Sequence, residues 1–597
     1  MDVKDVQRNI SLIRSPAAGL KDRQVLLVGS IVFGFLATLW LVICALLQQS
    51  LPNELSPQAG YIFDYVVVGA GTSGCVVASL LAKHSNATIL LLEAGGKFGY
   101  LSKIPLLATF QQQGLNDWAF LSVPQQHSSK GLNEQRQQLP RGKGLGGSAQ
   151  LNFMLHYDGS AADFDTWASA HNLSDWRWEA VQPFLTAGYA KPYEMLEISS
   201  SYSKLSEAFY AAESEFAHKP WQFRRARYNI QNGLRKSVLQ RFLEPVLDNR
   251  NLKIMTNALA RRLLLHEPLP KTFVRRVRSI LVGVRGAKED LFTIEVLSGI
   301  GDIDLLQRLH IPVQHALPRV GHNLHDHLNL PLFVSIDVVG PTLNQRALLD
   351  PISLFKYLFS GGGHLGNFGV IGHIDSELHN CGLTLFGAGA IDESALMSIS
   401  NFKRSHFRAL FPRYHNSSQE GFVLISTCTQ PRSRGSVSIS AANMRRNPLI
   451  DPNYLSENSD VDCNIRAIRA AVALITSQSF SALRPRIHWP KIRECSNFGP
   501  FERDFQLNAP TDRYLECILR HVGLTSHHPG GSCSMGQSAA DSVVNAKMRL
   551  HGIPNLRIVD ASILPTPISG NPNSIIVGMA VRAATMILSE EQKTNSN

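Results

Sequence analysis

The chain has 597 residues, of which 44% are hydrophobic and 18% are charged, so it can bury more than one core and is too apolar to be disordered. Its formal net charge is +11, but the lysines and arginines are scattered, and no basic cluster is interleaved with aromatic residues. The charge therefore indicates a basic solvated surface and argues against a nucleic-acid-binding protein.

The first predicted element is an apolar segment near the N-terminus. Val25 to Leu47 (residues 25–47) is a run of 23 residues without a charge, which is enough to cross a hydrocarbon core of about 30 Å. Five basic residues precede it, and none lies between Gln48 and Val68. The positive-inside rule then puts residues 1–24 in the cytoplasm and the remainder on the extracellular or luminal side. We expect a single-pass signal anchor; the alternative is a cleaved signal peptide and a secreted protein, although no clear cleavage site is present.

Residues 48–60, which include two prolines and a glycine, are predicted to be a linker. Beyond it, Asn86-Ala-Thr, Asn172-Leu-Ser and Asn416-Ser-Ser are glycosylation sequons on the side predicted to be exposed, so a glycoprotein is expected. The eight cysteines show no CxxC pair and no metal-ligand spacing. An oxidising compartment would allow disulfides, whose connectivity the sequence leaves open.

A phosphate-binding turn opens the folded part of the chain. Residues 63–68 are apolar and β-branched, as in a buried parallel strand. Gly69, Gly71 and Gly74 follow with the spacing that allows a tight turn, close approach of a pyrophosphate and close helix packing. Residues 75–83 then form a predicted helix, whose N-terminus favours an anion. Thr72 and Ser73 complete the candidate cofactor-binding set in this turn.

A second apolar strand is predicted over residues 88–92, and it ends in Glu93, which follows Gly74 by 19 residues. An acidic residue at about this distance meets a ribose hydroxyl in dinucleotide-binding folds. The strand, turn, helix, second strand and acid are in register, and together they predict a dinucleotide-binding unit.

Further motifs lie downstream in a characteristic order: Pro140–Met154, Leu297–Gly301, Val320–Leu328, Thr525–Gly536, Val559–Ser562 and Ser569–Asn573. With the glycine turn, they resemble the segments of the glucose-methanol-choline (GMC) oxidoreductase family. The resemblance runs from about Phe63 to Leu588 and is strongest to the arthropod branch, which contains FAD-dependent glucose dehydrogenases. It implies bound FAD and the oxidation of an alcohol or sugar at its CH–OH group. Choline-like or oxidase activity is also open, with a quinone or oxygen as the electron acceptor.

The resemblance implies an α/β fold with two domains, which would follow the predicted N-terminal transmembrane helix. A discontinuous Rossmann-like FAD-binding domain would comprise residues 61–165, 250–330 and 521–590. Residues 166–249 and 331–520 would form an α+β substrate domain with an antiparallel sheet. Within the second domain, alternation over Gly435–Ser440 predicts a strand, and apolar spacing over Ile465–Ile475 predicts a helix.

The resemblance also implies roles for individual residues. His528 matches the family's catalytic histidine, and an imidazole near its pKa suits removal of a hydroxyl proton. Asn573 is assigned to the position where relatives have a second histidine or an asparagine, so its amide would hold the substrate oxygen. The candidate cofactor contacts of the later motifs are Arg141, Gly147, Ser148, Asn152 and Asp560. Leu151 occupies the place where some relatives carry a flavin-linked histidine, so the FAD is expected to be non-covalent.

The other histidines near these motifs are expected to be structural. His527 is interpreted as a loop residue. His325 and His327 have a spacing that could suit a metal, but the matching family segment binds none and no third ligand is evident. No metal is therefore predicted.

Two departures from the family pattern leave an alternative open. Between residues 288 and 297 about a dozen residues are absent, including a strand of the cofactor domain, and their loss could leave a sheet edge unpaired. Asp158 stands where relatives usually have arginine. The first interpretation is an FAD-dependent alcohol or sugar dehydrogenase; the second is a catalytically inactive, membrane-anchored protein that acts through surface interactions.

Overall fold

The structure is a computed structural model of the chain. It describes residues 38, 51–56, 60–107, 109–188, 203–268, 274–284, 298–338, 342–344, 350–367, 369–389, 393–411, 419–443, 446–499 and 510–595. Apart from Thr38, the predicted membrane segment lies outside this set, as do residues 285–297 and the sequon at Asn416. No helix among the described residues is both long and apolar enough to cross a bilayer. Residues from Pro52 onward form one compact unit, described below.

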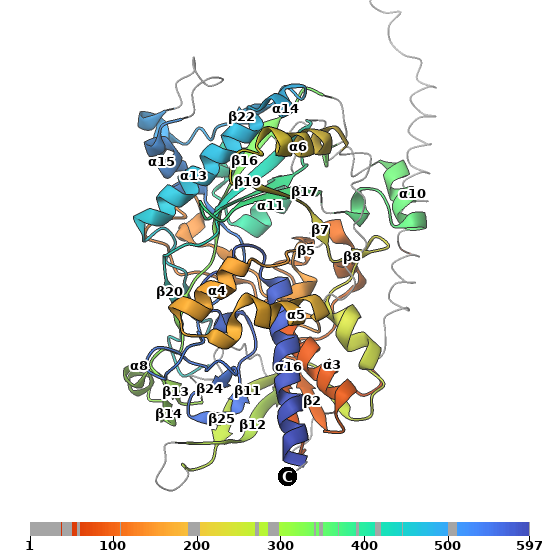
Figure 1. Ribbon diagram of the computed structural model, residues 1–597, viewed down its shortest axis with the longest axis vertical. Coiled ribbons are helices and arrows are strands. Elements are labelled where there is room, and N and C mark those ends of the chain that lie inside the picture. Colours follow the sequence, from red (N-terminus) through yellow and green to blue (C-terminus); the bar gives the residue numbers. More distant parts are fainter. Residues whose placement is uncertain are drawn as a thin grey trace, which may run out of the picture. The chain divides into compact units, whose positions relative to one another are not determined.

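The glycine turn belongs to a small parallel sheet. The order is β1 (Tyr65–Val68), β2 (Ile89–Leu92) and β10 (Leu252–Met255), with β2 in the centre. All four residues of β2 are buried, as a continuous apolar run in a central parallel strand requires. The predicted strands and the helix between them are confirmed; the helix is α3 (Thr72–His84), and the long α16 (Asn573–Asn595) packs against it (Figure 1).

The outer edge of β1 is open. Among the described strands, β1 pairs with β2 alone. Val66 and Val68 remain 40% and 41% exposed, although their register partners Leu90 and Leu92 are buried. An unpaired sheet edge is one outcome that the sequence analysis names for the short stretch at 288–297, and that stretch itself lies outside the described residues.

A larger antiparallel sheet forms the second layer of the unit. Its path runs β22 (Arg486–His488), β16 (Leu328–Ser335), β19 (Gly421–Cys428), β18 (Cys381–Phe386), β17 (Val370–Ser376) and β6 (Gln222–Arg225), and β23 (Leu524–Thr525) also pairs with β16. Pro331 is tolerated inside β16 because it falls between the residues that pair with β23 and those that pair with β22, where no amide is needed. The expected antiparallel sheet is therefore present, and it includes residues 524–525 from the stretch assigned to the cofactor domain.

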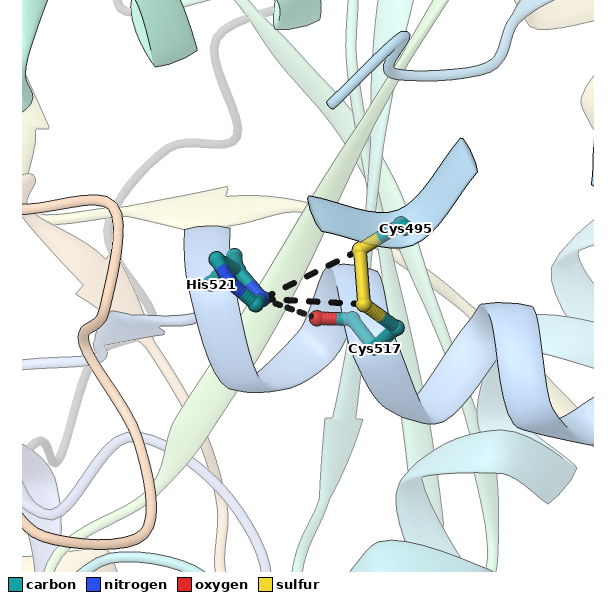
Figure 2. A group of neighbouring side chains, drawn as sticks. All are labelled: Cys495, Cys517 and His521. Atoms are coloured by element: carbon teal, nitrogen blue, oxygen red, sulfur yellow. Dashed lines mark hydrogen bonds between the residues drawn. A yellow bond between two sulfur atoms is a disulfide. The ribbon is translucent and has the colours of Figure 1, made fainter. Parts of the chain in front are cut away.

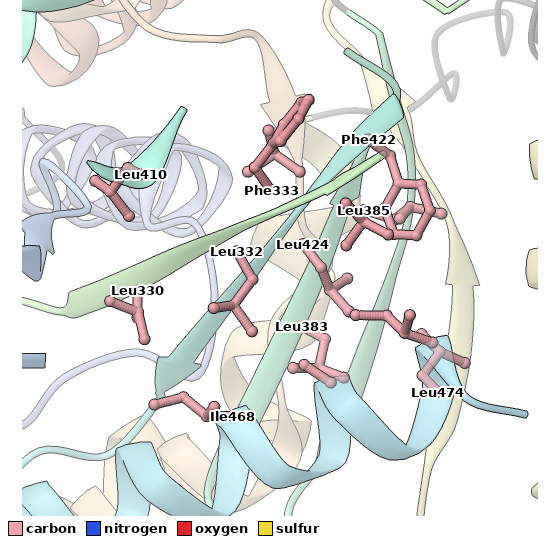
Figure 3. Packing of buried hydrophobic residues seen from close by; sticks show 14 of the residues in the cluster. Leu330, Leu332, Phe333, Leu383, Leu385, Leu410, Phe422, Leu424, Ile468 and Leu474 are labelled. Atoms are coloured by element: carbon pink, nitrogen blue, oxygen red, sulfur yellow. The ribbon is translucent and has the colours of Figure 1, made fainter. Parts of the chain in front are cut away.

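The main core lies between this sheet and α13 (Asn458–Ile475), which extends the predicted helix by seven residues at its start. Leu332, Leu424 and Leu385 are register partners in a row across three strands, and Figure 3 shows Ile468 and Leu474 of α13 packing against this part of the sheet. The predicted strand at residue 435 is β20 (Gly435–Ser438), which belongs to a separate small sheet.

Two disulfides cross-link elements of this layer. Cys428–Cys463 joins β19 to α13, and Cys495–Cys517 joins a 3₁₀ turn to α15 (Asp512–Val522). They supply the connectivity that the sequence left open. Closing such chain loops restricts the unfolded chain and so stabilises the fold.

Hydrogen exchange should detect the open edge of β1. Tyr65 and Gly69 donate their amides to Thr88 and Leu92 of the β2 segment, so the amides of Val66 and Val68 point the other way. We expect these two amides to exchange at least about tenfold faster than those of Tyr65 and Gly69, a difference of about 1.4 kcal/mol in opening free energy. Equal protection of all four would show that the edge is covered in solution.

Candidate active site

A cavity of about 1980 Å³ extends along β1 and the glycine turn and reaches the loop of residues 526–533. Its wall contains every candidate cofactor and catalytic residue named above. Segments from distant parts of the sequence meet there: residues 69–74, 139–155, 526–533, 558–562 and 571–573. The structure therefore brings the predicted site together in one place.

The glycine turn fits a pyrophosphate. A Cβ on Gly74 would lie 1.8 Å from the carbonyl oxygen of Gly69, so α3 can pack this closely only with glycine there. A Cβ on Gly71 would meet nothing within 4 Å, which leaves its backbone open to the cavity. The hydroxyl of Ser73 is buried without a hydrogen-bond partner among the described residues. An acceptor such as a phosphate oxygen would satisfy this orphaned donor.

Glu93 ties the end of β2 to the turn. Its carboxylate accepts the backbone amide of Ala70 at 2.9 Å and that of Gly95 at 2.8 Å. Burial raises the pKa of Glu93, and these backbone hydrogen bonds act against the shift. A backbone hydrogen bond from Gly144 uses a third of the four acceptor positions of the carboxylate, so one remains for the predicted ribose contact.

The segment around Gly147 forms the opposite wall. A Cβ on Gly147 would lie 2.6 Å from the Cα of Gly71, so the two backbones touch, and Gly147 has φ of 54°. Ser148 Oγ accepts the amide of Gly142, which folds this segment back on itself. Leu151 lines the cavity with an alkyl side chain, which offers no nucleophile for a covalent flavin bond.

Two further cofactor candidates have partners in the structure. Asp560 accepts the amide of Ser562 and so caps the short turn that follows it. The guanidinium of Arg141 lies 3.5 Å from the carbonyl oxygen of His527. His527, interpreted as structural, has a left-handed φ of 61°, lines the cavity, and has an Nδ1 that is buried without a partner among the described residues.

The buried carboxylate of Asp326 fixes the backbone around His528. One oxygen accepts the amide of His528 at 2.8 Å, and the other accepts the hydroxyl of Thr525 at 2.6 Å. The phenol of Tyr454 donates to the same oxygen as Thr525. Asp326 thus couples the start of β16 to the loop that carries the candidate base.

Two successive hydrogen bonds, between Thr429 and His327 and between His327 and His528, determine which nitrogen of His528 carries the proton. His327 Nε2 lies 2.9 Å from the carbonyl oxygen of Thr429, and a carbonyl only accepts, so this nitrogen carries a proton. Burial lowers the pKa of His327, which keeps the ring neutral and makes its Nδ1 an acceptor. His528 Nδ1, 3.0 Å away, must then be the donor. The lone pair of His528 is left on Nε2.

The cavity environment keeps His528 neutral. Burial is the largest cause that lowers its pKa well below the usual 6.5, and the neighbouring His327, His527 and Arg141 lower it further. A side-chain hydrogen bond with Asn571 acts in the opposite direction. The ring is therefore ready to accept a proton at neutral pH.

Two asparagines flank the site, with different contacts. Asn571 is the amide that bonds to His528, whereas Asn573, the residue predicted from sequence, begins α16 and has its Oδ1 3.4 Å from the Thr72 hydroxyl. The loop before them is held by Asp163, which accepts the amide of Ser569 at 2.8 Å and the amide nitrogen of Gln430 at 2.7 Å. The role assigned to Asn573 remains a prediction, and Asn571 is a second candidate.

The histidines with metal-like spacing are engaged elsewhere. His325 Nε2 lies 3.3 Å from the carbonyl oxygen of Leu564, and His327 Nδ1 is hydrogen-bonded to His528 Nδ1. Figure 2 shows the one group with metal-ligand distances among the described residues: Cys495, Cys517 and His521. The two sulfur atoms are bonded to each other, so neither is a thiolate that could bind a metal.

Asp158, the departure from the family pattern, has local partners. It forms an ion pair with Arg227, and His156 Nε2 lies 3.2 Å from it. It does not line the cavity as far as the described residues define it. The substitution thus leaves the base and the glycine turn untouched.

Comparison with known proteins establishes the family. Residues 63–329 and 431–580 match the N-terminal and C-terminal profiles of the GMC oxidoreductases. The chain belongs to the GMC oxidoreductase family. Members of this family such as choline dehydrogenase and formate oxidase are FAD-dependent oxidoreductases.

Several relatives cover nearly the whole chain. The protein named "Neither inactivation nor afterpotential protein G" of Drosophila melanogaster is 59% identical over 582 residues, which is 96% of this chain and 99% of that protein. The oxygen-dependent choline dehydrogenase of Yersinia pestis is 29% identical and covers 90% of this chain and 95% of its own length. A formate oxidase structure from Aspergillus oryzae RIB40 superimposes with a TM-score of 0.71 at 19% identity, over 90% of this chain and all of that one.

The sequence analysis assigned no functional role to three residues that contact His528 in the structure. Asp326, His327 and Asn571 all lie in motifs recognised from sequence, but only the fold shows that they contact His528. Asn571 begins the Asn-Pro-Asn string, so its proximity to Asn573 was an available signal. Thr429 carried none, because its contribution is a backbone carbonyl.

The lowered pKa of His528 predicts the pH dependence of turnover. A histidine base works only when neutral, so flavin reduction should be independent of pH through the neutral range and should fall only below 6.5, the ordinary pKa. Rapid-reaction measurement of flavin reduction against pH tests this. A rate that falls by half or more between pH 8 and pH 7 would place the base pKa above the range that the buried site allows.

Proposed function

We propose that this protein is an FAD-dependent oxidoreductase that oxidises the CH–OH group of an alcohol or sugar, with His528 as the base. The observation that carries the proposal is the ordered series Thr429–His327–His528, which puts the proton of His528 on Nδ1 and its lone pair on Nε2. Family membership supports the redox chemistry, and the site geometry supports the proton chemistry.

The residues of the chain have separable tasks in this proposal. FAD held along the glycine turn would supply the hydride acceptor, its N5 atom. His528 Nε2 takes the hydroxyl proton, and the resulting imidazolium keeps its Nδ1–H directed at His327. Asn571 and Asn573 provide amides that orient the substrate oxygen. The apolar side chains of Phe153, Met154 and Leu155 on the cavity wall exclude water from the reacting carbon.

The cofactor is proposed to be non-covalent, because Leu151 offers no atom for a flavin bond. We further propose that residues 25–47 anchor the enzyme in a membrane with the catalytic unit outside the cytoplasm, where quinone or oxygen would accept the electrons. The two disulfides support an oxidising compartment. The inactive alternative draws no support from the site, because the base, its partners and the glycine turn are all present.

Matched substitutions test the roles of the site residues. His528→Ala should retain FAD and slow flavin reduction by about 10² to 10⁴, as loss of a general base does. Asn571→Ala and Asn573→Ala should each be milder, because an amide orients but takes no proton. The larger loss of the two identifies the amide nearer the substrate oxygen. Stopped-flow absorbance with an accepted alcohol measures reduction apart from reoxidation.

The controls separate the parts of this proposal. Acid precipitation of the unmodified protein should release a yellow cofactor into the supernatant, and flavin retained in the pellet would refute non-covalent binding. Undiminished reduction in His528→Ala would remove this residue from the mechanism. Absence of reduction by sugars, choline and simple alcohols in the unmodified protein would favour the non-enzymatic interpretation.

The orientation predicted from the basic residues is testable in sealed microsomes. Added protease should leave the bulk of the chain intact, because the five basic residues before residue 25 hold only the N-terminal tail in the cytoplasm. Detergent should then make the catalytic unit accessible. Digestion before detergent would refute the orientation.

A further inference from the structure

Arg235 is a buried cation behind the cavity wall. It ends β9 (Leu234–Arg235), which pairs with β8 (Ile230–Gln231) across an Asn232-Gly233 turn. Both turn residues have positive φ, 51° and 70°, as a two-residue hairpin of this kind requires. Gly233 packs directly on the backbone of Gly361, where a Cβ would lie 2.1 Å from the carbonyl oxygen. The side chain of Arg235 is thereby fixed inside the protein, 1% exposed.

All the hydrogen-bond acceptors of Arg235 are neutral carbonyl oxygens. They are Ser102 O at 2.8 Å, Ala149 O at 2.8 Å, Asn152 O at 2.9 Å and Asn152 Oδ1 at 2.7 Å. No carboxylate pairs with it among the described residues. Burial alone lowers the pKa of Arg235 to about 9, and even this value leaves it charged at neutral pH. A cation without an anion is costly inside a protein, so its retention needs a reason.

Three of these four bonds reach the segment that faces the predicted flavin. An arginine has only donors, so the side-chain atom of Asn152 that meets it must be the oxygen. The amide of Met154 donates to the same oxygen at 3.1 Å and enforces the same orientation. The amide nitrogen of Asn152 has no partner among the described residues, and Asn152 lines the cavity. Asn152 therefore offers a donor to whatever occupies the cavity.

We propose that Arg235 is a positioning residue for the cofactor: it turns the amide nitrogen of Asn152 toward the FAD cavity and sets a positive charge behind it. The inference rests on the proposed function, because it concerns FAD. Donors and positive charge beside a flavin favour the form that carries more negative charge, which is the reduced one. Arg235 thus favours acceptance of the hydride without touching the substrate.

The test measures binding and reduction potential, not turnover alone. R235M removes both the donors and the charge. R235K keeps a charge but loses the planar fork that grips Asn152. K236M removes a charge from the next residue and serves as the matched control, and N152A removes the amide. For each variant, titration of apoprotein gives the affinity for oxidised FAD, and a redox titration gives the preference for reduced over oxidised FAD.

R235M should weaken FAD binding about tenfold and reduce the preference for reduced FAD about tenfold, which is about 30 mV in a two-electron potential. R235K should weaken binding and retain most of the preference. N152A should weaken binding, and adding R235M to it should cost less than R235M costs alone, because the two residues act as a unit. K236M should change neither quantity.

Several results would overturn the inference. R235M with unchanged affinity and preference would do so, as would a K236M effect of equal size, which would indicate a general charge effect. If R235M does not fold, R235K decides: unchanged FAD binding in R235K contradicts the positioning role. An unmodified protein that binds no FAD refutes the proposed function itself, whereas normal FAD binding with an unresponsive Arg235 refutes only the inference.

Discussion

The carboxylate of Asp326 is the constraint on which the site depends. It lies two residues before β16, and besides the amide of the adjacent His327 it accepts hydrogen bonds from Thr525, His528 and Tyr454. A buried carboxylate must be satisfied, and here three donors from two other segments do so. The loop that carries the base is thereby fixed to the sheet. The position of His528 follows from the core of the molecule and not from the loop alone.

The proposed chemistry depends on the neutral state of two histidines, which results from their burial. In water both rings of a histidine pair would titrate near neutrality. Enclosure keeps His327 and His528 neutral, and one backbone carbonyl, Thr429 O, then determines which nitrogen of each ring carries the proton. A similar logic governs Asn152, whose orientation is determined by a donor-only arginine. In both cases a group that does not reach the substrate decides what the facing group can do.

The motifs with short-range causes were predictable from sequence. The Gly69–Gly74 turn, its flanking strands and α3 depend on local spacing, and the structure confirms them. The antiparallel sheet was expected from the family resemblance.

The contacts of Arg235 and Asp163 were not predictable, because each joins residues separated by tens to hundreds of positions. The sequence also could not show which of Asn571 and Asn573 contacts the base, because that depends on the folded position of both amides. An unpaired sheet edge was one outcome named for the residues missing near position 290, and among the described strands β1 has such an edge, at which Val66 and Val68 are partly exposed.

The central claim is that His528 is neutral with its proton on Nδ1, which leaves Nε2 as the base. Nitrogen-15 NMR of histidine-labelled protein tests it most directly, with the His528 signals assigned by their loss in a His528→Gln variant. The account predicts a protonated, pyrrole-type Nδ1 and an unprotonated, pyridine-type Nε2 at pH 7. A proton on Nε2, or protonation of both nitrogens at that pH, would contradict it.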